Sequence, residues 1–180
     1  RAEKVVSIEL DKRLLPVLHE TLGNHPNAKV VNDDVLKVDL QRLLQEEFAG
    51  MDVVVCANLP YYITSPVIMR LLEERLPIRA LTVMVQKEAA QRLCAPPGTR
   101  ACGAVSVAVQ YYAEPRVLFQ VSRGSFLPPP NVDSTVIRLD VREQPPIYVP
   151  DERRFFALVK AAFGQRRKTI LNAVSAGLSV

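Results

Sequence analysis

Apolar and polar residues alternate along the first half of the chain in blocks that predict strands separated by helices. The short apolar runs predict strands over residues 4–9, 28–31, 51–57 and 80–85. The segments between them predict helices over residues 11–20, 40–48, 64–75 and 86–94. The continuous apolar run at 51–57 is typical of a parallel strand that is covered on both faces.

In the second half of the chain, strands follow strands. We expect a strand pair over residues 104–112 and 116–121, and a further strand over 134–141. Strands that alternate with helices and are then followed by strands predict an α/β sheet with a late antiparallel portion.

A change of composition marks the end of this sheet domain. Six of the 14 prolines lie between residues 128 and 150, and the stretch 143–150 predicts a linker. Beyond it, residues 152–163 and 167–176 predict two helices. We therefore expect a sheet domain over 1–142, a linker over 143–150, and the start of a small helical domain over 151–180.

The composition is that of a globular protein, with 48% hydrophobic and 23% charged residues in a chain of 180. No apolar run reaches the roughly 18–20 residues that a membrane span needs, and the first residues do not resemble a signal peptide. The three cysteines have no CxxC spacing, so we expect neither a disulfide framework nor a metal site. A reducing cytoplasm is the natural location for such a chain.

The positive charge is concentrated at the C-terminal end. Residues 151–180 carry six basic and two acidic side chains, which accounts for the whole net charge of +4. A basic segment of this kind fits a polyanion, and RNA or DNA is the first candidate. The alternative is an ordinary solvated helix face.

Glycines are too widely spaced to form a phosphate-binding loop. No two of the seven glycines are closer than five residues, so the chain contains no GxGxxG loop and no Walker loop. In a Rossmann-like nucleotide-binding sheet, a first strand and its glycine turn would precede the strand at 4–9. We therefore expect the chain to be a piece of a longer protein.

Two carboxylates follow predicted strands at the ends where open α/β sheets bind ligands. Glu9 could accept hydrogen bonds from both ribose hydroxyls of a nucleoside, or it could be a surface acid. Asp34 could accept from an adenine amine, or it could cap a helix.

The segment Asn58-Leu59-Pro60-Tyr61, directly after a buried strand, is more specific. An aromatic amine is a poor nucleophile because its lone pair is delocalised into the ring. The Asn58 side-chain oxygen and the carbonyl of Leu59 or Pro60 could accept both amine hydrogens and free that lone pair, while Tyr61 stacks on the base. The alternative is a plain strand-to-helix turn in which Asn58 is a cap and Tyr61 belongs to the core.

At these residues the chain resembles the class I, S-adenosylmethionine-dependent RNA adenine methyltransferases, which have a Rossmann-like fold. It resembles most closely the small-subunit (16S) ribosomal RNA adenine dimethyltransferases, the kasugamycin-resistance family. The matching stretches are VVSIELDKRLLPVL, NDDVL, VVVCANLPYYITSPVIMRLLE, VMVQKEAAQRL, FLPPPNVDSTVIRL and AAFGQRRKTILNAV. They cover nearly the whole chain, but the family's first strand, its glycine loop and much of its C-terminal domain are not among them.

The resemblance implies roles for individual residues. The S-adenosylmethionine site would include Glu9, Asp34, Val35 and Asn58. The target adenine would be held by Asn58, Leu59, Pro60 and Tyr61, with Phe126 closing on its other face. Ribosomal RNA phosphates would be contacted by Arg166, Arg167 and Lys168.

Two of these assignments have structural alternatives. Phe126 could be a core residue before a proline-rich turn, and the three basic residues could fix a domain interface instead. Residues 132–134 would shape the turn into the last strand rather than touch substrate.

The activity implied is N6,N6-dimethylation of two adjacent adenosines in a hairpin loop of small-subunit ribosomal RNA, during ribosome biogenesis. The partner would be the small (30S) ribosomal subunit, and the protein would be a monomer that uses no metal. The alternatives are the related large-subunit ribosomal RNA adenine methyltransferases of macrolide resistance, a non-catalytic RNA-binding assembly factor, and an inactive fragment. The stretches YYITSPVIMRLLE and AAFGQRRKTILNAV favour the small-subunit enzyme.

Overall fold

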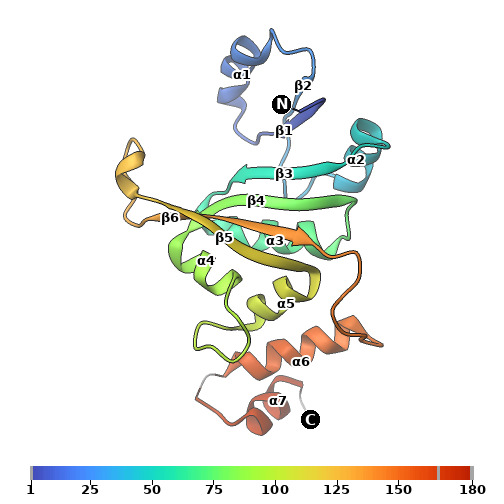
Figure 1. The fold of residues 1–180 in the computed structure, drawn as a ribbon, viewed down its shortest axis with the longest axis vertical. Coiled ribbons are helices and arrows are strands. Elements are labelled where there is room, and N and C mark those ends of the chain that lie inside the picture. Colours follow the sequence, from blue (N-terminus) through green and yellow to red (C-terminus); the bar gives the residue numbers. More distant parts are fainter. Residues whose placement is uncertain (1, 166, 179–180) are drawn as a thin grey trace.

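A computed structural model describes residues 2–165 and 167–178 (Figure 1). The strands are β1 (Val5–Ile8), β2 (Ala28–Val31), β3 (Val53–Asn58), β4 (Ile78–Gln86), β5 (Ala113–Val121) and β6 (Ser134–Val141). The α-helices are α1 (Leu15–Leu22), α2 (Leu40–Phe48), α3 (Thr64–Glu73), α4 (Lys87–Leu93), α5 (Ala104–Tyr112), α6 (Glu152–Gly164) and α7 (Ile170–Leu178). Short 3-10 turns are η1 (Lys12–Leu14), η2 (Tyr61–Ile63) and η3 (Arg123–Ser125).

The strands form two sheets. β1 and β2 form a parallel pair, and the other four strands are arranged in the order β3-β4-β6-β5. β3 runs parallel to β4, whereas β6 runs antiparallel to both of its neighbours. The predicted α/β sheet with a late antiparallel portion is therefore confirmed. Among the described residues, no strand pairs with the second edge of β1 or of β3.

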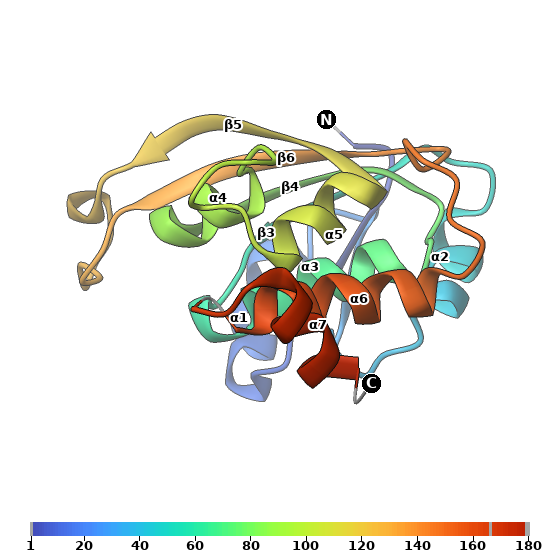
Figure 2. The same cartoon turned by 90° about the horizontal axis from the view of Figure 1, so that it is seen from below.

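The core lies on one face of the four-stranded sheet. Leu81, Val83 and Val85 of β4 are fully buried, and they alternate with half-buried residues as the period of a strand requires. Ile137 and Leu139 of β6 are buried in the same alternation. Figure 2 shows α3, α4 and α5 on a common side of β4, β5 and β6, with α6 and α7 beyond them.

The strand predicted at 51–57 is present, but its covering differs from the prediction. Val53 is buried, whereas the side chain of Val54 is 60% exposed and Cys56 is exposed as well. The expectation that both faces of this strand are covered is therefore wrong for the described structure, in which one side of β3 is open.

The strand predicted over residues 104–112 is also wrong, because this segment is the helix α5. Its valines alternate with small residues at a period of two, which is the pattern of a strand. A local capping interaction favours the helix instead: Ser106 Oγ accepts a hydrogen bond from the Gly103 amide at 3.0 Å and donates one to the Arg92 carbonyl at 2.6 Å. The strand predicted at 116–121 is confirmed within β5.

The helix α6 packs on α5 through an aromatic cluster. The rings of Tyr111 and Tyr112 lie within 5.6 Å of those of Phe155 or Phe156 in α6. Glu152 at the start of α6 accepts hydrogen bonds from both tyrosine hydroxyls, at 3.0 and 3.4 Å. Burial and this carboxylate raise the pKa of Tyr112 to about 12.

The two predicted C-terminal helices are both present. The second begins three residues later than expected, at Ile170. Within the described ranges, no helix is both long and apolar enough to cross a membrane.

The contact between α6 and α7 depends on a small residue. A Cβ atom at Gly177 would lie 2.5 Å from Ala161 Cβ and 2.9 Å from its Cα, which is too close for the helices as they stand. We predict that Gly177→Ala forces α7 away from α6 and lowers the free energy of unfolding by about 1–3 kcal/mol.

Gly164→Ala is the matched control, because a Cβ atom there would meet no heavy atom within 4 Å. Thermal unfolding followed by circular dichroism measures both variants. Equal midpoints for the two variants would contradict the close packing of these helices.

Candidate nucleobase and cofactor site

The candidate site lies at the edge of the sheet where β3 and β4 end. Asn58, the last residue of β3, is opposite Met84 of β4. Gln86 at the end of β4 is opposite Ser134, the first residue of β6. The carboxyl ends of the parallel strands and the β5–β6 connection therefore share one edge, which is where open α/β sheets bind ligands (Figure 1).

The chain leaves β3 in a fixed direction. The Leu59 amide donates to the Met84 carbonyl at 3.3 Å, which extends the ladder one residue past the strand. The Leu59 side chain is 7% exposed and anchors this point in the core, whereas Asn58 is exposed. The helix that follows is not capped by Asn58, because its N-cap residue is Ile63.

Tyr61 is half-buried and is held at its tip. Its hydroxyl oxygen lies 2.9 Å from Ser134 Oγ, within hydrogen-bond distance, and either hydroxyl can donate. The neighbouring Tyr62 is 85% exposed. Tyr61 is therefore neither a buried core ring nor a free surface ring.

The two backbone carbonyls of this corner differ in their hydrogen bonding. The Pro60 carbonyl accepts from the Ile63 amide at 3.1 Å and from Thr64 Oγ1 at 3.3 Å. Among the described residues, the Leu59 carbonyl accepts no hydrogen bond. Of the two carbonyls that the sequence suggested as acceptors, the Leu59 carbonyl is thus the one that makes no hydrogen bond within the described structure.

The connection between β5 and β6 carries Phe126 and is fixed at its base. Asp133 Oδ1 accepts from the Arg123 amide at 3.0 Å, and the Asp133 carbonyl accepts from the Lys87 amide at 3.0 Å. Phe126 follows η3 and is half-buried. In the part of the chain that the structure describes, its ring makes no contact with that of Tyr61.

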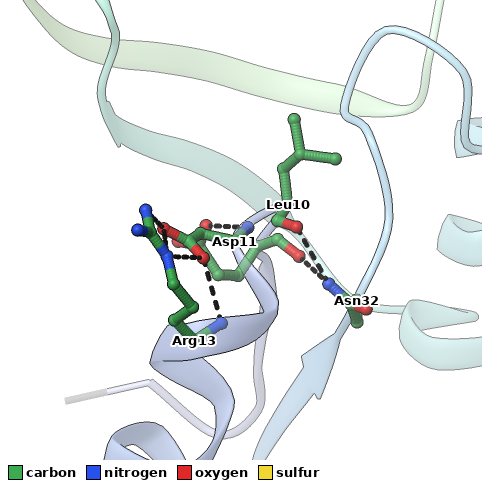
Figure 3. A network of polar contacts seen from close by, with 5 residues as sticks. Leu10, Asp11, Arg13 and Asn32 are labelled. Atoms are coloured by element: carbon green, nitrogen blue, oxygen red, sulfur yellow. Dashed lines mark hydrogen bonds and ion pairs between the residues drawn. The ribbon is translucent and has the colours of Figure 1, made fainter.

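Glu9 lies directly after β1. Figure 3 shows the polar contacts among the residues beside it, Leu10, Asp11, Arg13 and Asn32. Glu9 Oε1 accepts from the Asp11 amide at 2.7 Å, which leaves Oε2 available. Asn32 Nδ2 donates to the carbonyls of Glu9 and Leu10, at 2.7 and 3.3 Å, and so ties the ends of β1 and β2 together. Hydrogen bonds from Arg13 lower the pKa of Asp11 to about 2.

Asp34 takes part in a local turn after β2. Its Oδ1 accepts from the Leu36 amide at 2.9 Å, and its Oδ2 lies 3.8 Å from Lys37 Nζ. Asp34 therefore closes a turn and does not cap a helix, because the N-cap residue of the next helix, α2, is Asp39. Val35 is half-buried and packs against the core.

Sequence reasoning missed the residue that holds this turn. Arg70 of α3 donates to the carbonyls of Val35 and Val38, at 2.8 and 2.7 Å, and pairs with Glu74 at 2.6 Å. The signal in the sequence was a lone arginine among the apolar residues of α3. A long charged side chain can lie on such an apolar face only if its charged end reaches hydrogen-bond acceptors.

The remaining basic candidates lie between α6 and α7. Arg167 and Lys168 are exposed, and Arg166 lies outside the described residues. Within those described residues, no group of three or more His, Cys, Asp or Glu side chains could hold a metal ion.

Comparisons with known proteins agree with this arrangement. A profile of the family described as "Ribosomal RNA adenine dimethylase" matches residues 1–179. The chain belongs to this family. Ribosomal RNA small subunit methyltransferase A of Alkaliphilus oremlandii is 55% identical over 98% of the chain, and that of a Geobacillus species (strain WCH70) is 56% identical over 96%.

Solved structures of two similar proteins have the same fold as this chain. A dimethyladenosine transferase from Plasmodium falciparum superposes with a TM-score of 0.79 and 29% identity, over 99% of this chain and 63% of that one. The 23S rRNA methyltransferase ErmE superposes with a TM-score of 0.73 and 28% identity, over 98% of this chain and 68% of that one. The Rossmann-like methyltransferase fold class is therefore confirmed. The chain spans about three fifths of the length of the curated relatives, 62% and 60% of the two named above.

The anchoring of the β5–β6 connection by Asp133 leads to a prediction. Removal of the carboxylate in Asp133→Ala frees the Arg123 amide, and a hydrogen bond to a charged group contributes about 1.5 kcal/mol or more. We predict about tenfold faster tryptic cleavage after Arg123, because cleavage follows the population of the opened loop.

Asn131→Ala changes an exposed side chain in the same connection and is the control, with cleavage at the wild-type rate. The measurement is the initial rate of appearance of the two fragments. Indistinguishable rates for Asp133→Ala and the wild type would show that this hydrogen bond does not restrain the loop.

Proposed function

We propose that the protein containing this chain dimethylates the exocyclic amines of two adjacent adenosines in a small-subunit ribosomal RNA hairpin loop, with S-adenosylmethionine as methyl donor. The observation that carries the proposal is the corner after β3. It presents an exposed Asn58 amide and an unengaged Leu59 carbonyl beside a tethered aromatic ring, in a chain of the ribosomal RNA adenine dimethylase family.

The residues present fit the nucleoside half of S-adenosylmethionine. Glu9 follows β1 with one carboxylate oxygen available to the ribose hydroxyls, and Asp34 and Val35 follow β2 beside it. Asn58 adds a polar group at the end of β3. When bound, the cofactor supplies a methyl group on a positively charged sulfur, which is electrophilic.

The corner residues would prepare the amine for attack. The Asn58 side-chain oxygen and the Leu59 carbonyl accept its two hydrogens, which favours a pyramidal nitrogen with an exposed lone pair. Tyr61 stacks on one face of the base, and Phe126 closes on the other. The nitrogen becomes acidic once it is methylated, so its proton can leave to solvent beside the exposed Asn58 without a strong general base. Catalysis would then rest on positioning and on dipoles aimed at the amine.

The basic C-terminal segment would bind the RNA backbone. We propose that Arg166, Arg167 and Lys168 contact phosphates, in a helical domain that starts at 151–180 and follows the catalytic domain over 1–142 and the linker over 143–150. The packing of α6 on α5 would hold that domain at a fixed angle to the sheet. We further propose that the protein is a cytoplasmic monomer that needs no metal.

The nearest competing function is methylation of the large-subunit RNA. The solved 23S rRNA methyltransferase shares 28% of its residues with this chain, whereas the small-subunit relatives share 55% and 56%. A non-catalytic RNA-binding factor would have no need of the exposed amide and the unengaged carbonyl at the end of β3.

The proposed function is tested by methyl transfer in the intact protein. Small and large ribosomal subunits that lack the modification are incubated with radiolabelled S-adenosylmethionine. We expect dimethyladenosine to form in the small-subunit RNA. Label confined to the large subunit would favour the competing function, and label in neither would contradict methyl transfer.

In the same assay, we predict that Asn58→Ala abolishes most of the methylation. Loss of an oriented polar group at the reacting centre costs roughly 2–4 kcal/mol of transition-state stabilisation, or about 30-fold to 1,000-fold in kcat. Cofactor affinity should fall far less than kcat, because Glu9, Asp34 and Val35 remain to hold the nucleoside. Asn24→Ala, at an exposed turn after α1, is the control. Turnover near the wild-type rate in Asn58→Ala would remove this residue from the mechanism.

We also predict that Glu9→Gln weakens S-adenosylmethionine binding about tenfold or more, because a charge-assisted hydrogen bond contributes roughly 1.5–3 kcal/mol. The Gln side-chain oxygen can still accept from the Asp11 amide, so the local turn is kept. Calorimetric titration of the intact protein measures the affinity, with Glu20→Gln on the exposed face of α1 as the control. Equal affinities for the two variants would place the ribose elsewhere.

A further inference from the structure

We infer that Ser134 is a positioning residue for the proposed reaction: its buried hydroxyl fixes the ring of Tyr61 in the orientation that receives the target base. This inference rests on the proposed function and deepens it. The sequence suggested only that Ser134 shapes the turn into β6.

The Ser134 hydroxyl is held more firmly than its partner. The residue is 0% exposed, and its backbone lies between two strands, opposite Gln86 of β4 and Val121 of β5. Tyr61, in contrast, begins a short 3-10 turn and is only half-buried. The hydrogen bond of 2.9 Å therefore ties a ring on a turn to a rigid point of the sheet.

A tether at the phenol oxygen constrains the direction of the tyrosine side chain. The backbone fixes the Cβ end of the ring, and the Ser134 hydroxyl fixes the far end, so the long axis of the ring and its place in the site are determined. Stacking depends on that placement, because aromatic groups prefer offset face-to-face or edge-to-face contacts within a narrow range of distances. A tilted ring would move the amine away from Asn58 and Leu59.

The neighbouring residue, Asp133, similarly holds the segment that carries Phe126 on the other side of the proposed site. Asp133 holds the amide of Arg123 at the start of the segment that leads to Phe126. Two consecutive residues, Asp133 and Ser134, therefore hold the segment that leads to Phe126 and the ring of Tyr61. A change at Ser134 should affect the Tyr61 wall alone.

The test is a double-mutant cycle in the intact protein with Ser134→Ala, Tyr61→Phe and the combined variant. Both single changes remove one hydroxyl and keep the rest of the structure. We expect each to lower kcat about tenfold, the effect of losing one orienting hydrogen bond. The combined variant should be no slower than either single variant, because the same interaction is lost. KM for S-adenosylmethionine and for the small subunit should stay within about twofold.

Thr135→Val is the matched control, because it removes a hydroxyl from the next buried residue, whose side chain points to the opposite face of β6. Its kcat should equal that of the wild type, whatever its melting temperature. Tyr61 is half-buried, so Tyr61→Phe removes the same hydrogen bond without a change in the core. It therefore still tests the inference if Ser134→Ala is unstable.

The outcomes separate the two proposals. An inactive wild type overturns the proposed function and the role of Ser134 with it. If the wild type is active, three results would each overturn the role of Ser134 and leave the proposed function standing. The first is full kcat in Ser134→Ala or Tyr61→Phe, and the second is a loss of about a hundredfold in the combined variant, the product of the two single losses. The third is a loss of kcat in Thr135→Val as large as that in Ser134→Ala.

Discussion

The pairing of β3 with β4 continues past the last residue of β3, and the geometry of the site depends on that one extra hydrogen bond. The Leu59 amide is bound to the Met84 carbonyl, so the backbone cannot turn until Pro60. Asn58 is thereby left at the rim of the sheet with its side chain exposed, while Leu59 is buried beneath it. The Leu59 carbonyl has no hydrogen-bond partner among the described residues.

The helix α3 connects the two parts of the site. It begins directly after the Tyr61 turn, and near its other end Arg70 binds the backbone after β2. An α-helix is stiff over this length, so the turn at Val35 and the corner at Asn58 are held at a set separation. The β1–β2 pair shares no strand ladder with β3 in the part of the chain that the structure describes, and this helix contributes a second connection.

A half-buried carboxylate has a comparable role at the C-terminal end. Glu152 accepts from two tyrosines of α5 and pairs with Arg75, so α6 is fixed to the rest of the fold by oriented hydrogen bonds as well as by ring contacts. The position of the basic residues that follow α6 therefore depends on this contact between α5 and α6.

The sequence by itself determined the order of most strands and helices, because apolar periodicity is a local property, and it singled out Asn58-Leu59-Pro60-Tyr61 because an amide, a proline and an aromatic ring rarely follow a buried strand together. It failed at 104–112, where alternating valines suggested a strand but the capping of Ser106 and the packing of α5 favour a helix. Only the tertiary structure decided that the Leu59 carbonyl is unengaged, that Arg70 holds the turn after β2, and that Ser134 holds Tyr61. Each of these facts joins residues that are far apart in sequence, 73 positions in the last case, and no local pattern records such a contact.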